Sequence, residues 1–337
     1  MKAEISSAEL VEAFSMSTVT EVYGGPLTLT NLKDTLKTSG DLWVVRGDLA
    51  PGVPNAKSFV YELLFERVKE ELDAHPDYAV SDGVGSSGVE AMHFHAQLHN
   101  RRCVFVIARE FELPLHVASW GDVEFIRADG LAEWGYVRKL AEVLRTRTDI
   151  IPLHQAFYGP RAMARVGNRV VQELEKLGVR PDASVFVAAS ASSLWGIGKI
   201  LANRFSSETI LATKYTSIDR AILRDESKMR TIARNMLKGY SMRNPSASTP
   251  EVDRSLFPLH VALASVPILR CVALTGKPGI DLVVRVTIED ADRVQTQLRA
   301  VGYNWTYTTA FALVKAIQLA NEGKNVVAMV YGANRNT

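Results

Sequence analysis

Three segments of the sequence carry residue types that do chemistry, and each stands where an apolar, strand-like run gives way to a helical pattern. In the first, residues 54–59, Lys57 lies between a loop and an apolar helix. A lysine at a helix start opposes the helix dipole, so the dipole does not favour it there. Burial would lower the pKa of this amine and expose its neutral, nucleophilic form, as a Schiff-base lysine requires. An ordinary surface lysine is the competing interpretation.

The second segment is the glycine-rich turn from Asp82 to Gly88, in which Gly83 to Gly88 have the spacing GxGxxG. Glu110 follows 22 residues after Gly88, close to the position of the acidic residue that binds a ribose hydroxyl in dinucleotide sites. One alternative is therefore an NAD(P)-dependent dehydrogenase that uses this turn. Ser86 and Ser87, with the backbone amide of Gly88, offer another use, because hydroxyls and amides bind a ligand carboxylate. A tight turn that needs glycine is the structural alternative.

The third segment, residues 188–193, is a run of alanine and serine between a buried strand and a helix. Side chains this small let backbone amides approach a phosphate group, and Ser190, Ser192 and Ser193 add hydroxyl donors around Ala191. The lysine of a nucleotide-binding P-loop is missing, which disfavours hydrolysis of nucleoside triphosphates. Close packing of the strand against the helix is the structural alternative.

Strands and helices alternate along the chain, which is the pattern of an α/β protein with a mostly parallel sheet. Parallel sheets bind ligands at the carboxyl ends of their strands, and all three segments stand at such ends. The predicted strands are residues 42–46, 78–81, 103–108, 123–127, 184–189, 209–212, 281–286 and 326–330. The predicted helices are residues 58–74, 89–100, 133–145, 164–177, 194–204, 290–301 and 309–320.

The chain has 337 residues, of which 47% are hydrophobic and 23% charged, which suits a globular protein of two domains. Its longest uncharged stretches are shorter than the roughly 20 apolar residues of a membrane helix, and its first residues lack the apolar core of a secretory signal. Two separate cysteines, Cys103 and Cys271, exclude a disulfide framework. His95 and His99 are one helical turn apart without an evident third ligand, so we expect no metal site. We expect a cytoplasmic protein that does not bind a membrane.

Basic residues are concentrated in two stretches, although the net charge is only +2. Residues 220–243 contain seven lysines and arginines against two acidic residues. Solvated helix faces explain such stretches, and attraction to an anionic partner, including nucleic acid, is the alternative that stays open. The second stretch consists of Arg138, Lys139, Arg145, Arg147, Arg161, Arg165 and Arg169.

Taken in order, the three segments resemble the fold type II enzymes that use pyridoxal phosphate (PLP), a family that includes cysteine synthase, threonine synthase, the serine/threonine dehydratases and the tryptophan synthase β chain. Residues 54–59 are similar to the family's GSFKDR segment, and residues 86–88 to its SSGN loop. Residues 181–197 are similar to its phosphate strand and loop, PDxVVVPVGTGGTxxGI. Shorter matches are residues 25–27 (TPL), 308–310 (SSGAA) and 323–327 (EGKNVV).

The resemblance covers nearly the whole chain and implies its architecture. We expect a two-domain α/β fold of mostly parallel sheets flanked by helices, like that of the tryptophan synthase β chain. Residues 43–151 would form the smaller domain, with the lysine and the Ser-Ser-Gly loop. Residues 1–42 together with residues 152–337 would form the larger domain, with the phosphate loop. The family also implies a homodimer.

The resemblance implies a role for each segment as well. It places Lys57 at the lysine that binds PLP, residues 190–193 at the loop that holds its phosphate, and residues 86–88 at the loop that holds the substrate carboxylate. Two cofactor-binding positions depart from the family. Val89 stands where the family has the asparagine that contacts the 3-hydroxyl of PLP, and Tyr331 lies near the serine or threonine that faces the pyridine nitrogen.

The implied chemistry is that of PLP with an amino acid, through an external aldimine and a carbanion at the α carbon, with Lys57 as acid and base. The family favours β-elimination or β-replacement, so a lyase-type reaction is the first hypothesis. Decarboxylation or another tailoring of an amino acid carried by a larger anionic molecule, such as modified DNA, is the second, motivated by residues 220–243. The dehydrogenase is the third, and it leaves Lys57 and the serine run without a role.

Overall fold

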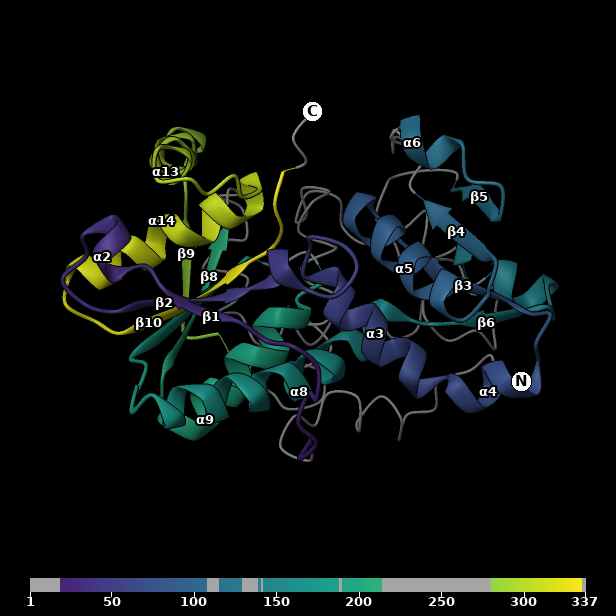
Figure 1. Ribbon diagram of the computed structural model, residues 1–337, viewed down its shortest axis with the longest axis horizontal. Helices are drawn as coiled ribbons and strands as arrows, with labels where there is room; N and C mark the ends of the chain where they lie inside the picture. The colour runs from purple at the N-terminus through teal and green to yellow at the C-terminus, as the bar shows by residue number, and fades with distance from the viewer. Residues whose placement is uncertain are drawn as a thin grey trace, which may run out of the picture.

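The computed structural model describes residues 19–107, 115–128, 139–140, 142–187, 190–213 and 280–334. Their strands form two separate sheets, with helices α3 (Lys57–Arg67) and α8 (Gln155–Lys176) between them (Figure 1). The other helices are α2 (Lys33–Leu36), α4 (Lys69–Ala74), α5 (Ser86–Leu98), α6 (Leu115–Ala118), α9 (Lys199–Phe205), α13 (Ile288–Ala300) and α14 (Tyr307–Asn321), with the single-turn helices η2 (Gly47–Leu49) and η3 (Leu194–Gly198).

The larger sheet has six strands in the order β1-β2-β10-β7-β8-β9. The pair β1 and β2 is antiparallel, and every other pair is parallel. The strands are β1 (Leu29–Asn31), β2 (Leu42–Arg46), β7 (Ala183–Phe186), β8 (Glu208–Thr213), β9 (Leu282–Arg285) and β10 (Val326–Val330).

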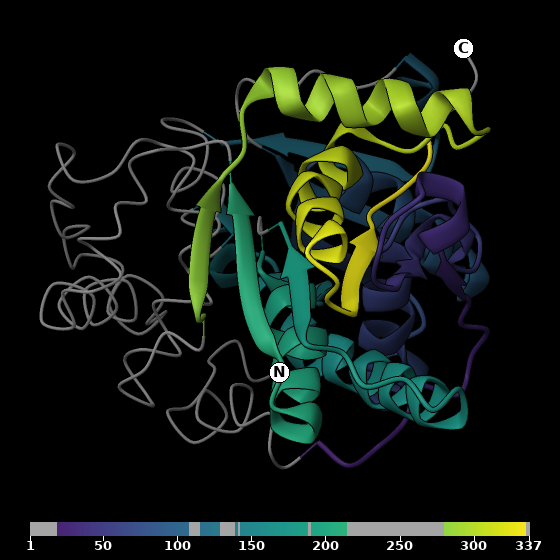
Figure 2. The same cartoon turned by 90° about the vertical axis from the view of Figure 1, so that its left-hand side faces the viewer.

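The alternation of side chains along β10 explains why both faces of the larger sheet are covered. Val326, Ala328 and Val330 pack into a cluster with α13 and α14, whereas Val327 and Met329 pack into the cluster that includes α8 and η3. Figure 2 shows α13 and α14 on one side of the sheet and α9 on the other. All five residues of β10 are buried, as a central parallel strand requires.

The smaller sheet has four parallel strands in the order β5-β4-β3-β6. These are β3 (Ala79–Gly83), β4 (Cys103–Ile107), β5 (Val123–Arg127) and β6 (Ile150–Pro152). The strand order reverses at β3, so the turn between β3 and α5 lies at a topological switch point, where α/β sheets bind their ligands. This order suits a dinucleotide site as well as a PLP site, so the sheet alone does not choose between them.

The fold confirms the predicted α/β class of mostly parallel sheets flanked by helices. The boundaries of several elements differ from the predictions. The helix predicted at 58–74 is two helices that break at Val68, and α8 begins at Gln155 rather than residue 164 because Pro160 is accommodated inside it. The sequence did not predict β1, α2 or β6, which are only three or four residues long.

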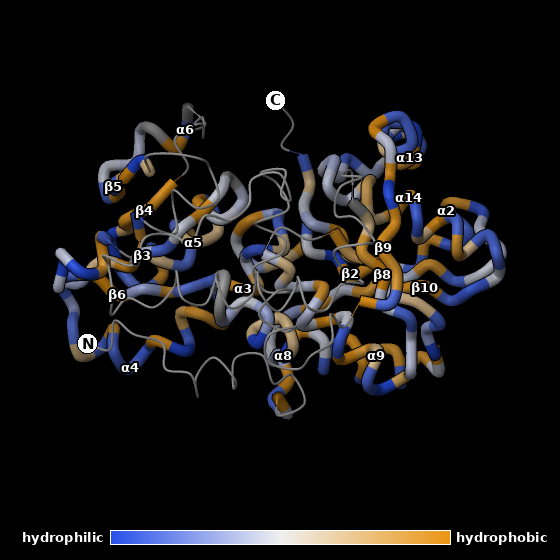
Figure 3. Tube along the Cα trace, turned by 180° about the vertical axis from the view of Figure 1, so that it is seen from behind, coloured by the Kyte–Doolittle hydropathy of each residue, from blue (hydrophilic) through white to orange (hydrophobic). Residues whose placement is uncertain are grey.

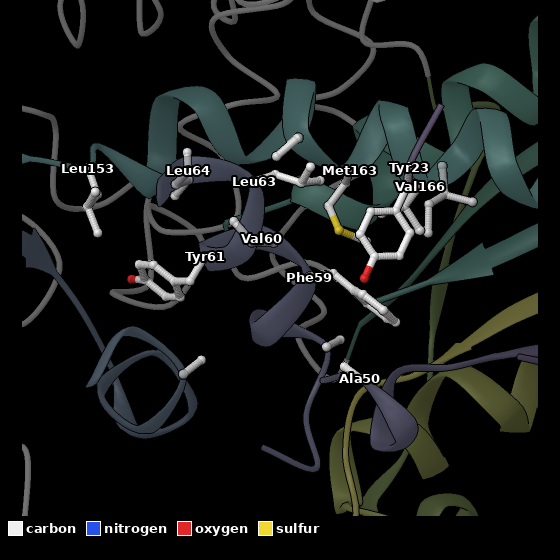
Figure 4. Packing of buried hydrophobic residues seen from close by; sticks show 14 of the residues in the cluster. Tyr23, Ala50, Phe59, Val60, Tyr61, Leu63, Leu64, Leu153, Met163 and Val166 are labelled. Atoms are coloured by element: carbon white, nitrogen blue, oxygen red, sulfur yellow. The ribbon is translucent and has the colours of Figure 1, made fainter. Parts of the chain in front are cut away.

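The core between the two sheets is built on α3, which is buried on most of its surface. Phe59, Val60 and Leu63 of α3 lie near Met163 and Val166 of α8 (Figure 4). Tyr23 meets Phe59 edge to face, with ring centroids 5.5 Å apart. Figure 3 colours the chain by hydropathy and shows apolar strands inside the molecule and a polar outer surface on α13. Because α3 is packed this tightly, its first residue has a fixed place.

The predicted boundary at residue 43 falls inside β2, which lies wholly in the larger sheet. The rest of the proposed division into residues 43–151 and the remainder stays a prediction. Among the described residues, no helix has both the length and the apolar character needed to cross a bilayer.

Candidate functional site: a half-buried lysine that faces a serine loop

Lys57 is the first residue of α3, and the loop before it is attached to the end of β10. The side chain of Asn55 accepts a hydrogen bond from the Lys57 amide at 3.0 Å, an Asx turn that leads into the helix. The Ala56 amide donates to the carbonyl of Tyr331 at 2.9 Å, and Asn55 bridges to Gly332. Backbone contacts with a central strand therefore hold the lysine in place.

The amine of Lys57 contacts a residue that is 133 positions away in the sequence. Its Nζ donates a hydrogen bond to Ser190 Oγ at 3.0 Å. Burial lowers the pKa of Lys57 to about 8, and the charge of Asp82 acts in the opposite direction. An exposed lysine, with a pKa of about 10.4, is almost entirely protonated at neutral pH. At pH 7, by contrast, roughly a tenth of the Lys57 amine is neutral. The amine is thus available as a nucleophile.

The serine loop (residues 190–193) lies between β7 and η3 and brings the hydroxyl groups of Ser190 and Ser192 together. The Oγ atoms of Ser190 and Ser192 are 2.9 Å apart, and the side chains of Ser192 and Ser193 are buried. Ala191 has a φ of 55°, a left-handed conformation that residues with a Cβ adopt where their surroundings impose it. Such conformations are concentrated in functional loops. The phosphate-binding role of residues 190–193 stays a prediction.

Gln155 is a site residue that the sequence analysis missed. It is the first residue of α8, and its Nε2 donates to Ser190 Oγ at 2.8 Å and to Ser192 Oγ at 3.0 Å. An added Cβ at Gly159, one turn further along α8, would lie 2.4 Å from Ser192 Oγ, so glycine lets this helix approach the serine loop. The predicted start of the helix at residue 164 hid this contact.

Asp82, near the end of β3, is the second ionisable group close to Lys57 and was assigned no role from the sequence. It is 2% exposed and accepts hydrogen bonds from the amides of Gly83 (2.8 Å) and Gln155 (2.9 Å) and from the Tyr61 hydroxyl (3.4 Å). Burial raises its pKa to about 6, although these donors and Lys57 favour the carboxylate.

Tyr331 connects the loop that carries Lys57 with the serine loop. Its hydroxyl donates to the carbonyl of Val187 at 2.8 Å, accepts from the Val187 amide at 2.8 Å, and lies 3.2 Å from Ser193 Oγ. Its own amide donates to Thr309 Oγ1 at 2.9 Å. Burial raises the pKa of Tyr331 to about 12, so the phenol stays neutral.

The predicted carboxylate loop is the first turn of α5. The Gly88 amide donates to the Gly85 carbonyl at 2.9 Å, so it is already engaged, whereas the first amides of a helix have no acceptor within the helix. An added Cβ at Gly88 would lie 3.5 Å from the Tyr61 hydroxyl, which places this turn beside the group that binds Asp82. Ser87 is exposed and Val89 is buried, with 1% exposure. The substrate-binding role of Ser86, Ser87 and Gly88 stays a prediction.

Several predicted features lie outside the described residues: Glu110, the first two residues of the 188–193 run, and the basic segment 220–243. In the second basic stretch, described arginines and lysines pair with carboxylates. Lys139 pairs with Glu142, Arg147 with Glu124 and Asp149, Arg165 with Glu66, and Arg169 with Glu173.

The two histidines of α5 and His99, directly after the helix, make different contacts. His93 Nε2 lies 3.1 Å from Asp122 Oδ1, and its ring stacks on Trp120 with centroids 3.8 Å apart. His95 Nε2 lies 2.9 Å from Ser58 Oγ, next to Lys57 in the sequence, and His99 stacks on Phe65. The buried Ser58–His95 pair therefore helps to hold the start of α3.

No protein-family model matches the chain, and no curated protein matches it in sequence. Solved structures do match its fold. A hydrogen sulfide-producing enzyme from Fusobacterium nucleatum has a TM-score of 0.65 and 15% identity, over 97% of this chain and 96% of that one. A variant of a second such enzyme, in complex with an alpha-aminoacrylate intermediate, has a TM-score of 0.65 and 15% identity over 88% and 82% of the two chains.

Cysteine synthase from Entamoeba histolytica is similar to the same degree, with a TM-score of 0.65 and 13% identity over 99% of this chain and 89% of that one. The chain therefore has the fold of the type II PLP enzymes, and the resemblance seen in the sequence is confirmed. Identities this low establish the architecture, while the chemistry has to be argued from the site.

The described residues fit the phosphate and the aldehyde of PLP. The hydrogen-bond donors around Ser190 are serine hydroxyls, the side-chain amide of Gln155 and the amine of Lys57. Donors of this kind bind an oxyanion. The amine with a lowered pKa suits an aldehyde. Val89 has no polar atom to offer the ring hydroxyl, and the hydroxyl of Tyr331 is already bonded to Val187.

Proposed function

We propose that this protein is a PLP-dependent enzyme that acts on an amino acid in a lyase-type reaction, β-elimination or β-replacement. The observation that carries this proposal is the contact between the partly buried Lys57 amine and Ser190 in a loop of hydroxyl donors. The fold supports the proposal, because its solved neighbours include cysteine synthase and hydrogen sulfide-producing enzymes. A dehydrogenase would leave this contact without a function.

The described side chains divide the work between binding and proton transfer. Ser190, Ser192 and Ser193, with Gln155, would hold the phosphate of the cofactor, and Tyr331 would keep the serine loop in register with the loop that carries the lysine. Bound PLP supplies an aldehyde that condenses with amines and a ring that withdraws electrons from the substrate's α carbon.

Lys57 moves the proton at the α carbon of the substrate. A pKa of about 8 lets its amine accept a proton and return it near neutral pH. We assign Ser86, Ser87 and the start of α5 to the substrate carboxylate, because the unpaired amides and the dipole of a helix start favour an anion. Cysteine, serine and O-acetylserine are the substrates to test first. β-Elimination would release sulfide from cysteine, water from serine and acetate from O-acetylserine, and each would then give pyruvate and ammonia.

The proposal is tested by the visible absorbance of the purified protein after incubation with PLP. We expect a covalent adduct that borohydride reduction fixes and that peptide mapping locates at Lys57. Lys57→Ala should lose the adduct completely. Lys33→Ala is the matched control, because Lys33 also begins a helix but has a side chain that is 43% exposed and pairs with Asp41. A reduced adduct on another lysine, or none at all, would refute the assignment.

We also propose that the enzyme is a homodimer, which the resemblance to the type II PLP enzymes supports. Sedimentation velocity of the purified chain tests the assembly. A single species with the mass of one chain at all concentrations would contradict it.

A further inference from the structure

We propose that Asp82 is a positioning residue of the site, which caps helix α8 from strand β3 and supplies a negative charge that acts on the Lys57 amine. The family resemblance gives Asp82 no role, although this residue, near the end of β3, is the first of the second sequence segment. Its use in catalysis rests on the proposed function, whereas its two structural effects can be tested without cofactor.

The capping role follows from how α8 begins. His154, the residue before the helix, has a φ of 55° and its side chain makes no capping hydrogen bond. Asp82 Oδ2 instead accepts from the Gln155 amide at 2.9 Å, over a sequence distance of 73 residues. A carboxylate at a helix start also interacts favourably with the helix dipole. Asp82 therefore supplies the cap that the helix's own residues do not.

The cap determines where the Gln155 side chain lies. The backbone amide of Gln155 donates a hydrogen bond to Asp82, and its side-chain Nε2 donates to both Ser190 and Ser192. Because Lys57 Nζ donates to the same Ser190 hydroxyl, one chain of hydrogen bonds runs from β3 through α8 and the serine loop to the amine. A shift of the first turn of α8 would change the donors that surround Ser190.

The electrostatic role follows from the groups that face Asp82. On α3, Tyr61 donates to its Oδ2 at 3.4 Å and Lys57 brings the opposite charge; on α8 the facing group is the neutral Gln155. In the strand beside it, Asp82 pairs with the apolar Phe105. The charge of Asp82 raises the pKa of Lys57, whereas burial lowers it. Its carboxylate therefore opposes the effect of burial on the lysine.

The test is competitive acetylation of the cofactor-free full-length chain with acetic anhydride, read at Lys57 by peptide mass spectrometry across pH. Only the neutral amine reacts, so the rate reports its titration. Asp82→Asn removes the charge and keeps the size. We expect the titration midpoint of Lys57 to fall by roughly one unit, which makes labelling at pH 7 about fivefold faster. Tyr61→Phe is the matched control, because it removes a bond to Asp82 and leaves the charge, so its midpoint should lie near that of the wild type.

A measurement on the wild type keeps the proposal testable if Asp82→Asn fails to fold. As Asp82 becomes protonated below pH 6, the Lys57 amine should lose its neighbouring charge, and the labelling rate should fall less than tenfold per pH unit. Where Asp82→Asn does fold, hydrogen exchange at the first turn of α8 should also accelerate several-fold in this variant. A full tenfold fall per unit in the wild type, or an unshifted midpoint in a folded Asp82→Asn, overturns the inference.

These outcomes are distinct from failure of the proposed function. A chain that binds no PLP but shows the shifted midpoint in Asp82→Asn would refute the cofactor and retain the lysine–aspartate pair. A chain that forms the PLP adduct at Lys57 with an unshifted midpoint would do the reverse.

Discussion

Replacing Tyr331 by phenylalanine removes one hydroxyl and tests how the two loops of the site are joined. That hydroxyl makes two hydrogen bonds of 2.8 Å to the backbone of Val187 and lies 3.2 Å from Ser193 Oγ. The ring itself fits the same space as phenylalanine, so the change leaves the packing intact. The backbone bond from Ala56 to the Tyr331 carbonyl is also kept.

The expected loss follows from what the hydroxyl leaves behind. The amide and the carbonyl of Val187 both lose their partner, and an unsatisfied backbone group costs about 1–3 kcal/mol. Because Val187 is only partly buried, water can reach these groups, and about 1 kcal/mol each is the appropriate figure. Ser193 can rotate to another acceptor and adds little. Tyr331→Phe should therefore lower the free energy of unfolding by about 2 kcal/mol.

Urea unfolding followed by circular dichroism measures this loss. The control is Tyr307→Phe, whose exposed hydroxyl donates one bond of 3.1 Å to the Ile288 carbonyl and should contribute less than about 0.5 kcal/mol. In the loaded enzyme, Tyr331→Phe should also weaken retention of PLP, because the serine loop loses its anchor. Equal stability of the two variants, together with unchanged PLP retention, would show that Tyr331 does not hold the serine loop.

Two further predictions concern the frame around the site. Burial lowers the pKa of His95 to about 4, so at pH 5 this histidine is protonated in the unfolded chain and neutral in the folded chain. The free energy of unfolding of the wild type should therefore fall by about 2 kcal/mol between pH 8 and pH 5 relative to that of His95→Gln. Urea unfolding of both proteins at both pH values measures this difference. Parallel pH profiles of the two proteins would contradict this. An added Cβ at Gly196 would lie 2.4 Å from the Cβ of Met163, so Gly196→Ala should lower stability by about 2–3 kcal/mol in thermal unfolding, whereas Gly24→Ala, with nothing within 4 Å, should change little. Similar melting temperatures for both variants would show that η3 can move away from α8.

The order of elements and the class of fold could be predicted from local patterns. The apolar run of β4, with all five residues buried, and the helical periodicity of α14 are properties of short stretches of chain. The family resemblance could be recognised because the lysine, serine-glycine and serine segments are also short stretches of sequence that follow one another in a fixed order. Local patterns did not predict β6 or the early start of α8, because β6 has only three residues and because Pro160 indicates a helix boundary that the packing overrides.

The chemistry of the site depends on contacts between distant parts of the chain. A lysine at position 57 is visible in the sequence, but its pKa of about 8 results from burial and from Asp82, which belongs to another element. Gln155 reaches Ser190 and Ser192 only because β6 delivers the start of α8 beside the serine loop. Desolvation and charge act through space, so residue order sufficed to propose Lys57 as the reactive group, whereas its pKa and its partners depend on the fold.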